Sequence, residues 1–587
     1  MSSVFLSNVD DYLAPSQACV NPLFAESVNA KENNVNDVPS KEVAVVVPRL
    51  RTIRRKRKPS DVVTVGIPSD TTETAKVSMA DCLACSGCVT SAETVLVEQH
   101  SLKTLREKLA TLALSSSHPT TKIVFTVSPA SWADVLRHLD LPEAATSRQK
   151  LATFLNQTCR ASVVLDGEVP LLWSLEEAAR EFCHAYRRGR VTTTTTPPPA
   201  SIALSATQSK LLQDGTIVTH TTRSESHLPL VSSSCPAVVC LIEKSHPNRV
   251  PHLATTKSPM AMAGSYFSSS EYYSNGGTEQ CWHVGIMPCH DKKLEASRRD
   301  FTVNDQPDVD LVITTNEWID LIRETCGSSD AKVMRAFVES MEPAPSIPSL
   351  DMDGGEEPSV VLVEMKSVDS SERQISSENY FFAHSSGGYA DFIFRFAAKT
   401  LFGFSVEGHL PWRPIEKRGK MSARVAASRK KDYHSVALYR LSDGSYTMQR
   451  HDTDDATPVL HFATAYGFQT LQRILQPSDK NELDYDYIEA MACPSGCLNG
   501  GGQARLADRE SPKETRQRVT ETQRRCKVIS SSNDISDMNM DVYSKMCPSG
   551  PFGPEAQLRL HTHYHVVPPL QHSLGAAAGV AVQDTQW

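Results

Sequence analysis

The feature that most constrains this chain is a run of three cysteines, Cys82, Cys85 and Cys88, spaced three residues apart. Thiolates at this spacing can each reach a different corner of an iron–sulfur cubane from one tight loop. Gly87 suits such a loop because glycine accepts a positive φ angle. A fourth ligand is needed, and Cys19 is the candidate, although it precedes the run; an ordinary buried thiol is its alternative. For the run itself, the alternative is a zinc site.

A second group of cysteines is spread over the rest of the chain. Cys493 and Cys497 stand four residues apart, and Cys235 and Cys289 each lie beside a proline. Each of the two single cysteines is more often a core residue, but the four together would complete a four-thiolate site. The glycines at 500–502 let the backbone approach another group closely and leave N–H groups free to face sulfur or an anion. A phosphate-binding loop is the rival interpretation there, but the lysine of that motif is missing.

The 15 cysteines are expected to lie in a reducing compartment. No secretory signal begins the chain, and no run of about 18 apolar residues predicts a membrane span. In such a compartment clustered thiols indicate metal or redox chemistry rather than disulfides, and an odd number of cysteines argues against complete pairing. The 60 basic and 68 acidic residues give a net charge of −8. This balance does not indicate broad nucleic-acid binding, which is typical of basic proteins.

Alternating strand and helix patterns predict an α/β architecture with a mostly parallel sheet. Short apolar runs at 123–127, 161–165 and 309–313 are typical of buried strands, and Asp443-Gly444 predicts a hairpin. Ser174 and Glu177 have the spacing of a capping box, which predicts a helix start. Helices are expected at 142–156, 174–186, 317–324, 390–401 and 462–475.

Three regions are expected along the 587 residues. Residues 1–100 form an N-terminal iron–sulfur segment whose basic run at 54–58 is interpreted as a solvated loop, with a nuclear-localisation patch as the alternative. Residues 101–508 form the α/β domain, and residues 509–587 form a C-terminal region with a polar linker and a tail. Polar or compositionally biased stretches are interpreted as loops or disordered insertions; they lie at 187–227, 343–377, 413–432 and 509–537.

Five blocks of the sequence resemble the Nar family, the assembly factors related to iron-only hydrogenases that are also called nuclear prelamin A recognition factor-like proteins. The resemblance extends over nearly all of the chain outside the insertions. Its most specific parts are Met287-Pro288-Cys289 followed by Lys292, and the Cys493–Cys497 pair followed by three glycines. The blocks are Phe5–Tyr12 with Cys19, Asp81–Cys88, His283–Ala296, Ser386–Tyr389 and Met491–Gln503.

The resemblance implies the fold of the catalytic domain of iron-only hydrogenases with an added N-terminal cluster-binding segment. It also implies a component of iron–sulfur protein assembly in the cytoplasm, with the nucleus as a second location. Its implied partners are a scaffold of P-loop ATPases, a targeting complex that includes a WD40 protein, and apoprotein clients. It implies two 4Fe–4S clusters, an N-terminal one on Cys19, Cys82, Cys85 and Cys88 and a buried one on Cys235, Cys289, Cys493 and Cys497.

The same resemblance predicts that this chain is not an enzyme. In the related hydrogenases a cysteine directly before the first ligand of the buried cluster passes the proton, and here that residue is Ser234. A hydroxyl is a poor proton donor near neutrality because its pKa lies far above that of a thiol. Val238 and Met260 also depart from the family pattern, whereas Lys292 is retained. A two-cluster redox protein or hydrogenase-like oxidoreductase is the alternative function, and a zinc-dependent interaction module is a second.

The C-terminus carries one further signal. Members of the resembled family and clients of its targeting complex often end in an aromatic residue that docks on that complex. This chain ends in Trp587, after a glycine- and alanine-rich stretch at 575–582 that is typical of a flexible presenter. The alternative is an ordinary tail.

Overall fold

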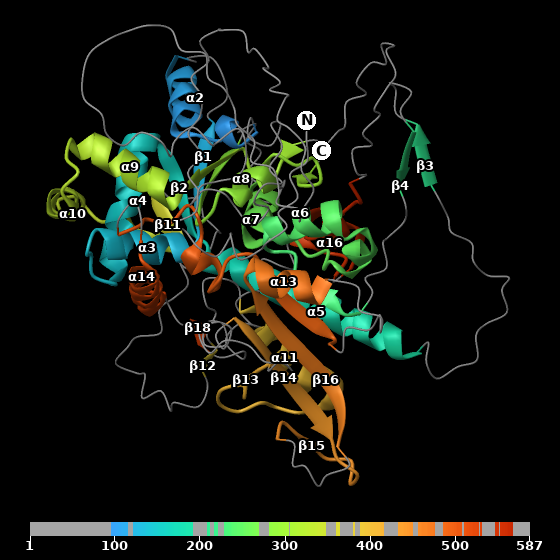
Figure 1. Ribbon diagram of the computed structural model, residues 1–587. Helices are drawn as coiled ribbons and strands as arrows, with labels where there is room; N and C mark the ends of the chain where they lie inside the picture. The colour runs from blue at the N-terminus through green and yellow to red at the C-terminus, as the bar shows by residue number, and fades with distance from the viewer. Residues whose placement is uncertain are drawn as a thin grey trace, which may run out of the picture.

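The structure is a computed structural model (Figure 1). Residues 1–95 of the expected N-terminal cluster segment, with its four cysteines and the basic run at 54–58, lie outside the residues that it describes, as does Trp587. Within those residues, no helix is long and apolar enough to cross a membrane. The structure describes residues 96–114, 121–191, 208–211, 217–220, 228–268, 281–303, 306–347, 360–363, 380–381, 388–415, 432–449, 456–475, 485–506, 510–526, 529–530, 546–550 and 552–567.

The first of two large sheets is entirely parallel, in the order β10-β11-β2-β1-β6-β9. Its central strands are buried on both faces, as their continuous apolar runs predict. Trp132, Leu151 and Trp318 from α3, α4 and α9 cover one face, while residues of α7 and α16 cover the other. The α/β prediction is therefore confirmed. The elements are β1 (Lys122–Val127), β2 (Ala161–Asp166), β6 (Cys281–Met287), β9 (Leu311–Thr314), β10 (Ser346–Ile347), β11 (Val361–Val363), α3 (Pro129–His138), α4 (Ala145–Cys159), α7 (Pro259–Phe267), α9 (Thr315–Cys326) and α16 (Pro554–Arg559).

The second sheet is mixed, in the order β13-β14-β16-β17-β5, with β15 paired to β14. Residues of α5 and α11 pack on one face and residues of α6 and α13 on the other. The long helix α5 runs between the two sheets in Figure 1 and contacts both β2 and α11. The elements are β5 (Leu230–Val231), β13 (Arg413–Pro414), β14 (Tyr433–Arg440), β15 (Tyr446–Thr447), β16 (Thr457–Tyr466), β17 (Tyr487–Met491), α5 (Glu168–Val191), α6 (Pro236–Ser245), α11 (Tyr389–Phe402) and α13 (Phe468–Leu475).

Smaller elements complete the described part of the chain. Among them α8 follows β6, η4 follows β17, and α14 lies beside α3. Their bounds are α2 (Leu102–Leu114), α8 (Asp291–Ala296), α10 (Ala331–Glu339), α14 (Pro512–Arg524), η3 (Pro247–His252), η4 (Gly496–Asn499), β3 (Gln208–Leu211), β4 (Ile217–His220), β7 (Thr302–Val303), β8 (Gln306–Pro307), β12 (Tyr380–Phe381) and β18 (Ile529–Ser530).

A buried ion pair ties the start of α7 to the segment before β9. The Lys257 ammonium donates to Asp308 Oδ2 at 2.7 Å, and the Ser265 hydroxyl donates to Asp308 Oδ1 at 2.9 Å. All three side chains are almost completely buried. Gly264 permits this approach, because a Cβ there would lie 1.7 Å from the Asp308 carbonyl oxygen. Burial raises the pKa of Asp308, and the Lys257 charge opposes that rise.

Two predicted helices differ from the structure. Helix α5 begins at Glu168, six residues before the predicted capping box at Ser174. The Ser174 hydroxyl instead contacts the Lys257 carbonyl at 2.8 Å and the Tyr389 hydroxyl at 2.6 Å. The range predicted as one helix at 462–475 holds the end of β16 and the whole of α13, with Gly467 at a φ of 83° between them. The hairpin predicted at Asp443-Gly444 is confirmed by the antiparallel pairing of β14 with β15.

The stretches interpreted as insertions also contain regular structure. Residues 343–377 include β10 and β11, and β11 pairs with β2. Residues 187–227 include the end of α5 and the β3–β4 pair, and residues 413–432 begin with β13. The stretch at 509–537 includes α14, which starts with a complete capping box between Ser511 and Glu514. Parts of the stretches that the sequence predicts as loops or insertions therefore form regular elements, of which helix α14 is the longest that lies wholly within one.

Candidate metal centre

Four of the predicted ligands follow the carboxyl ends of strands. Cys235 comes after β5 and precedes α6, whose first residue is Pro236, a residue well suited to a helix start. Cys289 lies between β6 and α8, and Cys493 and Cys497 follow β17. Strands β5 and β17 are parallel neighbours in the second sheet, whereas β6 belongs to the first. Loops beyond the carboxyl ends of parallel strands are where α/β folds commonly gather functional groups.

The four thiols lie close enough to influence one another's ionisation. The ionisation of Cys289 is affected by the charges of Cys235, Cys493 and Cys497, and Cys235 also affects the last two. The interaction between two charges weakens as the distance between them grows, so these effects indicate that the four thiols are near one another. The structure thus places the four cysteines that the sequence predicted for the buried site near enough for their charges to interact. Their role as ligands stays a prediction.

The surroundings of the thiols favour their neutral form in the absence of metal. Burial is the largest cause and raises the pKa of Cys235 to about 11 and that of Cys497 to about 12. The buried Asp291 carboxylate raises the pKa of both thiols further, while Lys292 lowers it. Arg505 lowers the pKa of Cys493. A thiolate at this site is therefore favoured chiefly by a bond to a metal, which deprotonates a coordinating thiol outright.

A tight turn joins Cys493 to Cys497. Ser495 and Gly496 both have left-handed backbones, with φ angles of 63° and 69°. The Gly496 N–H donates to the Cys493 carbonyl at 3.0 Å, and the Ser495 N–H donates to Asp432 Oδ1 at 3.0 Å. These bonds offset the strain of a non-glycine residue at positive φ. The turn lets two thiols that lie four residues apart reach one site.

The glycines after this turn bring the two sheets' loops into contact. A Cβ at Gly500 would lie 2.3 Å from the Pro288 carbonyl oxygen, and one at Gly502 would lie 2.8 Å from Thr314. The Gly502 N–H donates to that Pro288 carbonyl at 3.0 Å, and the Gly502 carbonyl accepts from the Asn316 N–H at 2.9 Å. The expectation of close backbone approach is confirmed, but the Gly502 N–H faces protein backbone, whereas the sequence suggested sulfur or an anion.

The residues present fit a thiolate-bound iron–sulfur cluster. The donor set is four cysteines, the ligands that such clusters take. The neighbouring Ser234 hydroxyl is buried and has no hydrogen-bond partner among the described residues. Lys292 Nζ donates to Glu295 Oε2 at 2.7 Å, so a cation near the thiols is itself paired. Within the described ranges, no three His, Cys, Asp or Glu side chains form a group that could hold a single metal ion.

Sequence reasoning singled out Lys292 but did not find two other charged residues that affect the thiols, Asp291 and Arg505. Asp291 lies two residues after Cys289, so its position in the sequence was the available signal. Arg505 carried no signal, because its effect on Cys493 depends on how the loop folds back. The predicted N-terminal ligands, Cys19, Cys82, Cys85 and Cys88, lie outside the described residues.

Comparisons with known proteins relate this arrangement to a family. Residues 201–501 match the model of the iron only hydrogenase large subunit, C-terminal domain. The "Cytosolic iron-sulfur assembly component 3" of Bos taurus is 30% identical over 96% of both chains. The "Protein NAR1" of Arabidopsis thaliana is 31% identical, also over 96% of both. The "Cytosolic Fe-S cluster assembly factor narfl" of Xenopus tropicalis is 29% identical over 97% of both.

Solved structures share the fold. An FeFe-hydrogenase superimposes with a TM-score of 0.55 and 21% identity, covering 79% of this chain and 98% of its own. A variant of the FeFe-hydrogenase HydA1 from Chlamydomonas reinhardtii gives a TM-score of 0.54 and 20% identity with the same coverage. At these identities the comparison establishes a common architecture.

Proposed function

This chain belongs to the family of cytosolic iron–sulfur assembly factors that share the large-subunit domain of iron-only hydrogenases, and we propose that it works in cytosolic iron–sulfur protein assembly. The single observation that carries the proposal is the proximity of four thiols from three strand ends, two of them buried and two partly buried, in a chain that matches such factors over 96% of its length. Cytosolic location follows from the same proposal, and the nucleus is a further proposed location.

The proposed cofactors are two 4Fe–4S clusters, which supply redox-active iron held by thiolates when bound. Cys235, Cys289, Cys493 and Cys497 would hold the buried one. Because these thiols come from loops of both large sheets, the cluster site joins parts of the fold that are remote in sequence. We assign it a permanent structural role. The other cluster would be held by Cys19, Cys82, Cys85 and Cys88.

The N-terminal cluster is the better candidate for transfer to clients or for oxygen sensing. Its proposed ligands come from one short run and one upstream cysteine, so only a small part of the chain would have to move to release the cluster. The proposed partners are a P-loop ATPase scaffold, a targeting complex with a WD40 protein, and apoprotein clients. Trp587 at the C-terminus is the proposed docking residue for the targeting complex.

Complementation tests this function. In cells depleted of their own family member, this chain is expected to restore iron incorporation into a cytosolic 4Fe–4S client, because it would resupply the missing assembly step. Radioactive iron bound to the immunoprecipitated client measures the result. A mitochondrial iron–sulfur protein is the control and should not change. Expression of the full chain without recovery of the cytosolic client would contradict the proposal.

We further propose that the chain is not a hydrogenase, although it has that fold. Ser234 occupies the position of the cysteine that passes protons in the related enzymes, and its hydroxyl is a poor acid near neutrality. Anaerobically purified, reconstituted protein is therefore expected to release no hydrogen from reduced viologen. Gas chromatography measures the product, and a cluster assay on the same sample shows that the protein is loaded. Hydrogen release in proportion to protein concentration would establish the redox-enzyme alternative.

A further inference from the structure

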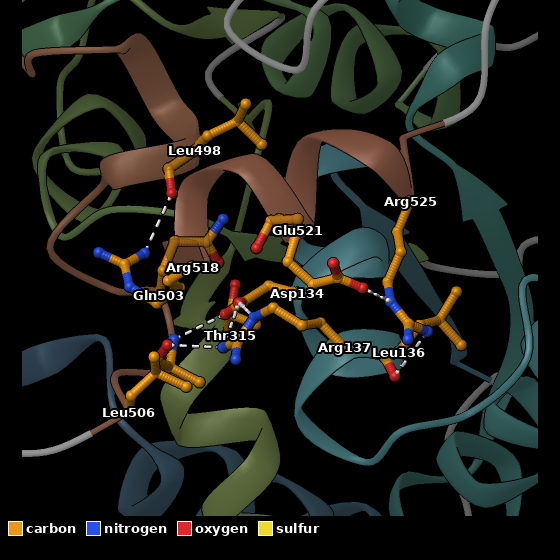
Figure 2. A network of polar contacts seen from close by, with 12 residues as sticks. Asp134, Leu136, Arg137, Thr315, Leu498, Gln503, Leu506, Arg518, Glu521 and Arg525 are labelled. Carbon is orange, nitrogen blue, oxygen red and sulfur yellow. Dashed lines mark hydrogen bonds and ion pairs between the residues drawn. The ribbon is translucent and has the colours of Figure 1, made fainter. Parts of the chain in front are cut away.

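Helix α14 carries an arginine whose burial needs explanation. The Arg518 side chain is 1% exposed, on a helix where Thr522 is the other buried residue. Burying a guanidinium is costly unless its charge is paired and its N–H groups find hydrogen-bond acceptors. Its Nε donates to both oxygens of Glu510, at 2.9 and 3.0 Å. Figure 2 shows the side chain reaching from α14 toward the loop that carries Leu498.

The remaining donors of Arg518 bind the residues directly after Cys497. One terminal nitrogen donates to the Leu498 carbonyl at 3.2 Å and the other to Asn499 Oδ1 at 2.8 Å. Both residues belong to the short helix η4, which contains Cys497. A helix this short leaves carbonyls without partners inside it. The Arg518 guanidinium therefore binds η4 through its terminal nitrogens, while Glu510 binds its Nε and fixes its orientation.

Helix α3 holds the other end of the same loop. Asp134 Oδ2 accepts from the Ala504 N–H at 2.6 Å, and an Arg137 terminal nitrogen donates to the Ala504 carbonyl at 2.8 Å. The Gln503 side-chain amide donates to the Ala130 carbonyl at 3.2 Å. The segment 498–504 is thus fixed at its far end by α3 and at its near end, beside Cys497, by α14.

We propose that Arg518 is a positioning residue for Cys497, and so for the cluster held with it; this inference rests on the proposed ligand role of the four cysteines. The contacts of Arg518 act on Cys497 through the backbone of η4. Lysine cannot reproduce them, because its single ammonium cannot bind Glu510, a carbonyl and an amide oxygen in one plane.

The chain offers a matched control on the same helix. Arg525, the C-cap residue directly after α14, also donates to backbone carbonyls, those of Leu136 at 3.3 Å and Leu141 at 2.6 Å. These contacts fasten α14 beside α3 and do not involve the cysteine loop (Figure 2). Arg518→Lys and Arg525→Lys therefore remove the same chemical group from one helix, but only the first releases η4.

Two measurements on the full-length protein test the proposal. Loss of iron from the buried site to a chelator, under anaerobic conditions, is expected to be about tenfold faster in Arg518→Lys, the effect of losing a hydrogen bond to a charged group. In metal-free protein, amide hydrogen exchange over 498–504 is expected to speed up by a similar factor. Arg525→Lys should match wild type in both measurements. If Arg518→Lys unfolds, Asn499→Ala, which leaves α14 intact, is expected to show the same two changes to a smaller degree.

The outcomes separate this inference from the proposed function. Equal iron loss and equal exchange in Arg518→Lys and Arg525→Lys would overturn the role of Arg518 while leaving cluster binding in place. If the wild-type protein bound no cluster on the four cysteines, that result would contradict the proposed function. Exchange over 498–504 in the metal-free protein would still decide whether Arg518 positions the loop.

Discussion

Replacing Cys289 with alanine is expected to remove about four irons from each chain and to unfold the protein at a much lower temperature. Cys289 is the proposed ligand from the first sheet, whereas the other three come from the second. Without it, the cluster site no longer joins the two sheets' loops. Metal binding contributes several kcal/mol of folding free energy in small metal-dependent domains. A loss of about 5 kcal/mol would lower the melting temperature by about 10 °C or more.

Cys85→Ala is the matched comparison for this variant. It is also expected to cost about four irons, because it removes a ligand of the proposed N-terminal cluster, but its melting temperature should stay close to that of wild type. Iron and acid-labile sulfide per chain, together with thermal unfolding of anaerobically purified protein, measure both effects. A Cys289→Ala protein that kept its iron and its melting temperature would refute the buried site. Unfolding of Cys85→Ala would refute the division of roles between the clusters.

Replacing Lys257 with methionine is expected to destabilise the protein by about 3–5 kcal/mol, the range for removing one partner of a buried ion pair. Methionine nearly preserves the shape of the lysine stem, so little of the loss should come from a cavity. The loss arises because Asp308 remains buried with the Ser265 hydroxyl as its remaining side-chain hydrogen-bond donor in the structure. Urea unfolding, followed by circular dichroism, measures the change in the free energy of unfolding.

The pH dependence of the Lys257→Met effect identifies its cause. Burial already raises the pKa of Asp308, and the pKa should rise further once Lys257 no longer opposes that shift. A carboxyl whose pKa is raised by folding stabilises the native state at low pH and loses that contribution as the pH rises through its folded-state pKa. The loss should therefore be smaller at about pH 5 than at about pH 7.5. Adding Asp308→Asn should recover most of the stability at the higher pH, and a loss that is independent of pH would contradict this explanation.

The strands of the first sheet could be predicted from local pattern. The apolar runs at 123–127 and 161–165 match β1 and β2 to within one residue at each end. They are buried on both faces by helices, so nearly every residue is apolar and the pattern is unambiguous. Helix α9 was also found, and the structure shows the reason for its start in a capping box between Thr314 and Glu317.

Other elements depend on tertiary contacts that leave little local trace. Ser174 and Glu177 have capping-box spacing, but Ser174 lies inside α5. Its hydroxyl forms hydrogen bonds with the Lys257 carbonyl and the Tyr389 hydroxyl. Helix α14 is polar on most of its surface, so its composition suggested a linker. Its contacts with the rest of the fold are polar: Arg518 pairs with Glu510 in a buried ion pair, and Arg525 donates to carbonyls at Leu136 and Leu141. A hydrophobic pattern in the sequence does not predict such contacts.

The candidate site divides in the same way. By itself, the sequence determined which residues are chemically able to hold clusters, because cysteine spacing and adjacent glycine or proline are local properties of the chain. Only the tertiary structure decided that Cys235, Cys289 and the Cys493–Cys497 pair converge, since their strands belong to different sheets. It also decided which charges surround them and which helices hold their loops. Local pattern fixes what each residue can do, whereas convergence depends on the packing of two sheets, whose contacts join residues far apart in sequence.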